Sequence, residues 1–217
     1  MKNEELVEHD NQNNLFGLCQ IPQPFLPFLV SKNDHNCVFS CGSQNNMFTA
    51  LETIYIDGSV KNFGTGSAII RFDEGIVERH YLFFSFADAI AFSIMYPKKV
   101  IRSILYILGK SPSASTLKLF TPKRHLRSHV ILCFPNTEYG ALQDIKVATE
   151  LCDQQTYFVV MGQDLEILYK ESRFTLDRLS LSLSSFRKKS GFRSAVKTAK
   201  PMKKPTFFEE LVYSTNI

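Results

Sequence analysis

Short hydrophobic runs, separated by stretches of helix length, dominate the middle of the chain. Runs with the length of buried strands cover residues 81–84, 104–108, 130–134 and 157–161. Between and after them, the spacing predicts helices over residues 87–95, 113–120 and 139–152. Buried strands that alternate with helices are typical of βαβ units, in which a parallel sheet is covered on both faces. We therefore predict an α/β domain of three layers with a mainly parallel sheet of about four strands.

The residues before position 80 have a different pattern, which indicates antiparallel β structure. Segments 48–56 and 67–72 have strand length, and glycine-containing turns lie between them. An apolar, proline-containing segment over residues 21–30 predicts a strap packed on the body. The expected organisation has three parts. These are a partly disordered N-terminal strap over residues 1–47, an α/β domain over residues 48–180 that includes a small antiparallel β region over 48–79, and a C-terminal arm over residues 181–217.

The composition of the 217 residues is that of a globular protein, with 44% hydrophobic and 21% charged residues. These fractions exclude a mostly disordered chain. The most apolar stretch, residues 81–96, is too short for a comfortable membrane span and carries Asp88 at its centre. The first five residues are polar and acidic, whereas a signal peptide begins with basic and apolar residues. We therefore expect a cytoplasmic protein without membrane contact.

Charge is distributed unevenly along the chain. Residues 1–172 hold 15 Lys+Arg and 18 Asp+Glu, whereas residues 173–217 hold 10 and 3. Basic residues placed near phosphates release counterions, so the C-terminal arm is a candidate contact for DNA or RNA. A solvated basic tail without a ligand is the alternative interpretation. The candidate contact residues are Arg187, Lys188, Lys189, Arg193, Lys197, Lys200, Lys203 and Lys204.

The five cysteines form an odd set at irregular spacing, which favours reduced thiols over a disulfide framework. One metal-like spacing occurs, His35-x-Cys37-x3-Cys41, with Cys19 upstream as a further candidate ligand. Zinc modules usually supply two close pairs of ligands, and the second pair is missing here. The sequence therefore favours no metal and no cofactor, and a structural zinc site is the less favoured alternative.

In open parallel sheets, ligands bind outside the carboxyl ends of the strands. The residues at those ends are 85–88, 109–113 and 135–140. No G-x-S-x-G motif and no G-x-x-x-x-G-K-[ST] loop occurs in the sequence, which argues against the hydrolase and nucleotide-binding chemistry that those motifs support.

Two of these segments carry a resemblance. They contain Phe84-Ser85-Phe86-Ala87-Asp88-Ala89-Ile90 and Pro135-Asn136-Thr137-Glu138-Tyr139-Gly140. Together with the order of strands and helices over about residues 45–180, they resemble the Toprim domain of bacterial primases, topoisomerases, OLD-type nucleases and recombination mediators. The greatest similarity is to Toprim proteins carried by mobile elements of Bacteroides-type bacteria. In that family the motifs are roughly E-G/S-x-x-D-A/F-L and D-x-D-x-x-G.

Asp88 and Gly140 match the family pattern, but the acids that hold the metal do not. Phe84 stands at the glutamate position, and Pro135 and Thr137 stand at the two aspartate positions. A phosphoryl-transfer site holds Mg²⁺ with two or more carboxylates, and Phe84 and Pro135 offer no side-chain oxygen. The remaining positions, Ser85, Asn136, Glu138 and Asp88, are expected to be vestigial, so the resemblance implies a protein that is not an enzyme.

The resemblance implies a nucleic-acid-associated accessory role in the replication or mobilisation of a mobile element. The expected partners are DNA or RNA, bound through the C-terminal arm, and a replication or mobilisation protein. A protein-interaction module without nucleic-acid binding is the alternative. A nuclease or primase that uses a divalent metal through unusual ligands is a less favoured third reading.

Overall fold

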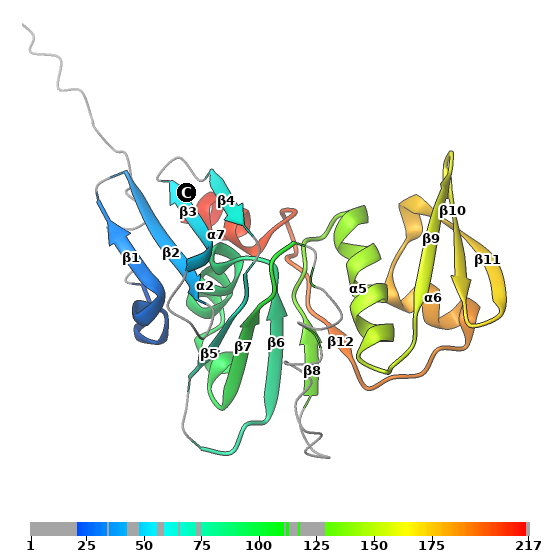
Figure 1. The fold of residues 1–217 in the computed structure, drawn as a ribbon, viewed down its shortest axis with the longest axis horizontal. Coiled ribbons are helices and arrows are strands. Elements are labelled where there is room, and N and C mark those ends of the chain that lie inside the picture. The colour runs from blue at the N-terminus through cyan, green and yellow to red at the C-terminus, as the bar shows by residue number, and fades with distance from the viewer. Residues whose placement is uncertain are drawn as a thin grey trace, which may run out of the picture.

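The computed structural model of the protein describes residues 21–33, 35–42, 48–55, 59–64, 66–72, 75–110, 112, 117 and 129–215 (Figure 1). Its strands form a four-stranded, a five-stranded and a three-stranded sheet. The five-stranded sheet lies in the middle of the molecule, and the other two sheets lie on opposite sides of it (Figure 1). The described residues contain no helix that is long and apolar enough to cross a membrane.

The central sheet has the strand order β12-β8-β6-β7-β5. Its strands are β5 (Ala68–Arg71), β6 (Arg79–Phe83), β7 (Ser103–Ile107), β8 (His129–Leu132) and β12 (Lys197–Thr198). The four strands β12, β8, β6 and β7 are parallel, whereas β5 pairs with β7 in the antiparallel sense. The predicted α/β class and the mainly parallel character of this sheet are confirmed.

Helices follow the parallel strands, as the hydrophobic pattern predicts. β6 leads into α2 (Phe86–Met95) and the short α3 (Pro97–Val100), and β8 leads into α5 (Glu138–Glu150). Along β6, Tyr81 and Phe83 belong to one buried cluster with α2, whereas Leu82 belongs to a second buried cluster with α5. Successive side chains of a strand point to opposite faces, so both faces of the central sheet are covered.

The N-terminal residues contribute more than the predicted strap. A 3-10 helix, η1 (Gln23–Phe28), precedes an antiparallel sheet formed by β1 (Leu29–Lys32), β2 (Asn36–Gly42), β3 (Phe48–Tyr55) and β4 (Val60–Gly64). β2 pairs with β3 from Asn36 opposite Tyr55 to Gly42 opposite Phe48. The boundary proposed at residue 47 therefore divides one sheet. Residues 1–20, predicted to be partly disordered, lie outside the described residues.

The predicted strand over residues 157–161 exists, but its placement in the parallel sheet is wrong. It forms β9 (Thr156–Met161), which pairs antiparallel with β10 (Asp164–Tyr169), and β11 (Ser172–Asp177) completes this third sheet. Gly162 has a φ of +65° and reverses the chain directly after β9. The tight turn leaves no room for a crossover helix, so β9 becomes part of a hairpin instead.

The C-terminal residues pack on the body of the protein. After η2 (Arg178–Ser180), the chain forms α6 (Leu183–Ser190), β12 and α7 (Phe207–Thr215). β12 is the fourth parallel strand of the central sheet, and α7 packs against α2. Phe186, Phe192 and Phe207 are buried. The apolar residues between the charges anchor this segment to the body. The prediction of a separate arm over residues 181–217 is therefore wrong for the part that the structure describes.

Candidate functional site

A cavity lies at the carboxyl ends of the parallel strands. Its volume is about 460 Å³, and residues from the ends of β6, β7 and β8 line it, among them Ser85, Lys110 and Pro135. A neighbouring cavity of about 330 Å³ shares Asn62, Phe84 and Lys110 with it. The structure thus brings together residues from all three segments that follow the predicted parallel strands, 85–88, 109–113 and 135–140. Most of the predicted helix over residues 113–120 lies outside the described residues.

Glu52 of β3 is the most unusual group beside these cavities. Its carboxylate is buried and accepts hydrogen bonds from the backbone N–H groups of Phe86 (3.0 Å) and Ala87 (2.8 Å), at the start of α2. The N-terminus of a helix attracts anions, so Glu52 occupies the place that a bound phosphate would take there. Burial raises the pKa of Glu52 to about 7, although the two N–H groups oppose that rise.

Asp88, in the first turn of α2, likewise accepts a backbone hydrogen bond, in this case from the start of α7. One carboxylate oxygen accepts a hydrogen bond from the backbone N–H of Phe208 (3.1 Å), and the other accepts one from the hydroxyl of Ser85 (3.1 Å). The Ser85 hydroxyl in turn caps α2 by accepting the N–H of Asp88. Burial raises the pKa of Asp88 to about 6. Glu52 and Asp88 therefore both accept hydrogen bonds from backbone N–H groups, and these bonds connect β3, α2 and α7.

These buried acids lead us to expect that the protein is more stable at about pH 5 than at about pH 8. Glu52 has a pKa of about 7 in the folded protein, against an ordinary pKa of 4.5, so the folded state holds the proton more tightly than the unfolded state. The stabilising contribution is complete below pH 4.5 and is lost as the pH rises through 7. For Glu52 alone it is on the order of 3 kcal/mol. Urea midpoints measured across this range test the expectation.

The variant Glu52→Gln should flatten this pH dependence, because a neutral amide does not titrate. Glu171→Gln is the matched control, since Glu171 is exposed at the turn between β10 and β11. A wild-type stability that rises between pH 6 and pH 8, or a Glu52→Gln profile that matches the wild type, would contradict the role given to Glu52.

The three positions where the resemblance expects metal-binding acids, Phe84, Pro135 and Thr137, have structural roles. The carbonyl oxygen of Pro135 accepts a hydrogen bond from Lys200. Phe84 and Phe134 are buried, and their rings stack with centroids 4.1 Å apart and planes 11° apart. Thr137 caps α5 by accepting the N–H of Gly140 at 3.1 Å. A Cβ atom on Gly140 would lie 2.0 Å from the carbonyl oxygen of Pro135, so only glycine fits there. Asn136 is exposed at this turn, and its N–H bonds to the carbonyl of Pro205.

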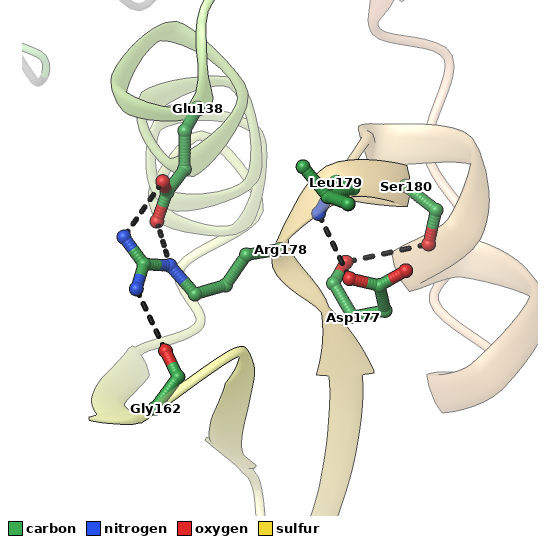
Figure 2. Close-up of polar contacts among 6 residues, drawn as sticks. All are labelled: Glu138, Gly162, Asp177, Arg178, Leu179 and Ser180. Atoms are coloured by element: carbon green, nitrogen blue, oxygen red, sulfur yellow. Dashed lines mark hydrogen bonds and ion pairs between the residues drawn. The ribbon is translucent and has the colours of Figure 1, made fainter.

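Glu138 pairs with an arginine at the start of η2, directly after the last strand of the third sheet. The guanidinium of Arg178 pairs with both of its carboxylate oxygens, at 2.6 and 2.9 Å, and also donates to the carbonyl of Gly162 (Figure 2). The hydrogen bond from Arg178 holds the pKa of Glu138 below its usual value. Asp88 and Glu138, the two acids that remain at the motif positions, therefore bind different partners.

Two of the eight basic candidates have internal roles. The ammonium of Lys200 lies 2.6 Å from the buried carboxylate of Asp144 and donates to the carbonyls of Phe134 and Pro135. Burial raises the pKa of Asp144 to about 6, although Lys200 opposes that rise. Arg187 donates to the carbonyl oxygens of Ser194 and Val196.

The other candidates remain at the surface. Lys188 and Lys189 lie in the last turn of α6, Arg193 follows this helix, Lys197 lies in β12, and Lys203 precedes α7. All five side chains are exposed. Lys204 is partly buried and stacks over the ring of Tyr213, 3.6 Å from its centroid.

The three candidate zinc ligands that the structure describes do not meet. Cys37 and Cys41 both point into the core from β2, and four residues of extended strand separate them by about 13 Å. His35 is exposed, and Cys19 lies outside the described residues. Within the part of the chain that the structure describes, no three or more His, Cys, Asp or Glu side chains come together in a way that could hold a metal ion.

Sequence reasoning missed Glu52 and Asp144 as residues of this region. A signal for Glu52 was present, because it has the same strand parity as Ile54, which points into the core. A charged residue at an inward-facing strand position indicates a buried contact.

No protein-family model and no curated protein matches the chain. Among solved structures, it is similar to the primase fragment of the bacteriophage T7 primase–helicase protein (14% identity, TM-score 0.39), over 56% of this chain and 52% of that one. It is also similar to a chain in a structure of the T7 lagging-strand DNA polymerase with two primase domains bound to an RNA/DNA hybrid and dTTP (15% identity, TM-score 0.34), over 50% and 57%. The chain thus spans little more than half the length of each. Likenesses with TM-scores this low identify neither a family nor a function.

Proposed function

We propose that this protein is a non-catalytic, Toprim-like α/β protein that binds nucleic acid and has an accessory role in the replication or mobilisation of a mobile element. The proposal that the protein binds nucleic acid rests on a long basic segment. From Arg178 to Phe208 the sequence contains nine Lys+Arg and no Asp or Glu. Phosphate contacts from such residues supply most of the affinity in sequence-independent binding.

The fold gives this segment an extended path. It leaves the third sheet through α6, crosses to β12 at the edge of the central sheet, and continues to α7 (Figure 1). The five exposed basic residues are spread along this path, and the buried Phe186 and Phe192 hold it against the body. A basic surface that is already ordered before it binds loses little conformational entropy when phosphates dock.

The contacts of the carboxylates near the cavity support the proposal that the protein is not a catalyst. Glu52 and Asp88 each accept hydrogen bonds from backbone N–H groups, and Glu138 pairs with Arg178. A Mg²⁺ ion that bound them would have to break these contacts and leave the donors without partners. We therefore expect no nicking, primer synthesis or strand passage when Mg²⁺ or Mn²⁺ is added.

We expect weak, sequence-blind binding to DNA or RNA that falls steeply with salt, measured by fluorescence anisotropy of labelled oligonucleotides. Replacing Lys188, Lys189 and Lys197 by glutamine removes three phosphate contacts. The log–log slope of affinity against salt should then decrease by about 2–3 for double-stranded DNA.

The matched control replaces Lys32, Lys61 and Lys98 by glutamine, which removes the same charge from exposed positions elsewhere. Equal losses in the two triple variants would show a response to net charge rather than to the basic segment. The absence of measurable affinity at low salt for the wild type would refute the proposal. Metal-dependent cleavage that Asp88→Ala abolishes would instead favour a nuclease.

A protein-interaction module is the second candidate function. An apolar strand at the free edge of the third sheet, with four exposed residues between Tyr157 and Met161, favours it.

A further inference from the structure

β9 forms a free edge of the third sheet and exposes apolar side chains to solvent. The strand order is β11-β10-β9, so one side of β9 pairs with β10 and the other side is unpaired within the described residues. Tyr157, Val159, Val160 and Met161 are each 55–58% exposed. An unpaired strand edge presents backbone donors and acceptors that can pair with another strand.

Every other edge strand in the described part of the chain carries a charged residue. These residues are Lys32 in β1, Lys61 in β4, Arg71 in β5, Lys197 in β12, and Arg173 and Asp177 in β11. β1 also has an irregular register between Leu29 and Ser31. Charges and bulges of this kind protect edges from unwanted pairing. β9 has neither, and the sequence from residue 154 to residue 163 contains no charged side chain.

The hairpin geometry shows which backbone groups of β9 point outward. Met161 pairs with Asp164 across the two-residue turn, Val159 with Glu166 and Tyr157 with Leu168. In a hairpin of this length, the pair next to the turn exchanges hydrogen bonds, and so does every second pair after it. The N–H and C=O groups of Thr156, Phe158 and Val160 therefore face the free edge.

Arg178 holds this hairpin in place. It donates to the carbonyl of Gly162 in the turn at 2.7 Å and pairs with Glu138 at the start of α5 (Figure 2). The free edge is thus already shaped as a strand before any partner arrives, which lowers the entropic cost of docking.

We propose that β9 is a dimerisation edge, which pairs antiparallel with β9 of a second copy of this chain about a twofold axis. The absence of charge on β9 favours a second copy of the chain as its partner. Two uncharged strands meet without repulsion, whereas a charged partner would find no counter-charge on β9. With Val159 opposite Val159 of the other copy, Tyr157 lies opposite Met161, and Phe158 lies opposite Val160. All five facing pairs are then apolar, and the outward groups of Phe158 and Val160 bond to each other across the axis.

Sedimentation velocity of the full chain tests this pairing. We expect a monomer–dimer equilibrium in the micromolar range, because one strand from each copy buries less area than a standard stable interface. Val159→Lys should weaken the dimer roughly tenfold or more, since each copy would bring a charge onto an apolar edge. Val30→Lys is the matched control, because Val30 is 51% exposed on β1, an edge strand of another sheet.

A wild-type chain that remains monomeric to high micromolar concentration would refute the proposal. So would a Val159→Lys variant that dimerises like the wild type, or a Val30→Lys variant that loses the dimer equally. If Val159→Lys does not fold, Val159→Cys decides the question. Facing residues at a non-hydrogen-bonded pair lie close enough for a disulfide, so oxidation should link two copies, whereas Val30→Cys and the wild-type chain should stay unlinked. No cross-link above the wild-type background would exclude the pairing.

Discussion

Replacing Phe134 by alanine is expected to destabilise the protein by about 3–5 kcal/mol, the range for truncating a buried aromatic side chain. Phe134 is fully buried, and its ring stacks on Phe84 at the ends of the neighbouring strands β8 and β6. The change removes this stacking and leaves a cavity beneath α5 that the close-packed interior can fill only in part. Urea unfolding measures the loss as a shift of the midpoint without a change of slope.

Phe84→Ala should have an effect of similar size, and the double variant should cost less than the sum of the two single changes. The two rings contact each other, so each single change already removes their shared interaction. Ile76→Ala is the control, because Ile76 is 84% exposed and should change stability by less than about 0.5 kcal/mol. Unchanged midpoints for both phenylalanine variants would contradict the placement of the rings in the core.

The second large effect is expected for Lys200→Met, which should cost about 3–5 kcal/mol, as the loss of one partner of a buried ion pair does. Asp144 is almost fully buried, and Lys200 supplies the ammonium that faces it. Without that ammonium, Asp144 keeps an uncompensated charge at neutral pH. The carbonyls of Phe134 and Pro135 also lose a donor.

The pH dependence of this loss separates the ion pair from a simple packing defect. Without Lys200, the folded protein can relieve the buried charge by protonating Asp144, so the destabilisation should be smaller at about pH 5 than at about pH 8. Lys197→Met is the matched control, because Lys197 is exposed on β12. A loss that is equal at both pH values, or equal in the two variants, would contradict the structural role of Lys200.

The sequence alone determined the class of the central domain. The strands β6, β7 and β8 coincide with continuous apolar runs, and α2 and α5 lie within one or two residues of the predicted helices over 87–95 and 139–152. These signals are local, since a buried strand needs apolar residues on both faces and an amphipathic helix repeats its apolar residues every three to four positions. For the same reason, the carboxyl ends of these strands could be selected as the place to look for a cavity.

Which strand joins which sheet was decided by the tertiary structure. An apolar run such as that of β9 has the same local pattern whether it joins a parallel sheet or a hairpin, and its pairing depends on where the chain goes next. β12 is only two residues long, and one of them is Lys197, so it has no hydrophobic signal at all. It pairs with β8 because the buried side chains on either side of it bring it there.

The roles of individual charges were likewise beyond the sequence. Lys197 and Lys200 look alike in a basic segment, yet one is exposed and the other pairs with Asp144, which is 56 positions earlier in the chain. Glu52 meets α2 across a separation of 34 residues. Composition and spacing determined that this chain is an α/β protein with a basic C-terminal segment. Which charges face solvent and which satisfy buried partners follows only from long-range packing, because a charged group is stable inside a protein only where the fold brings its partner to it.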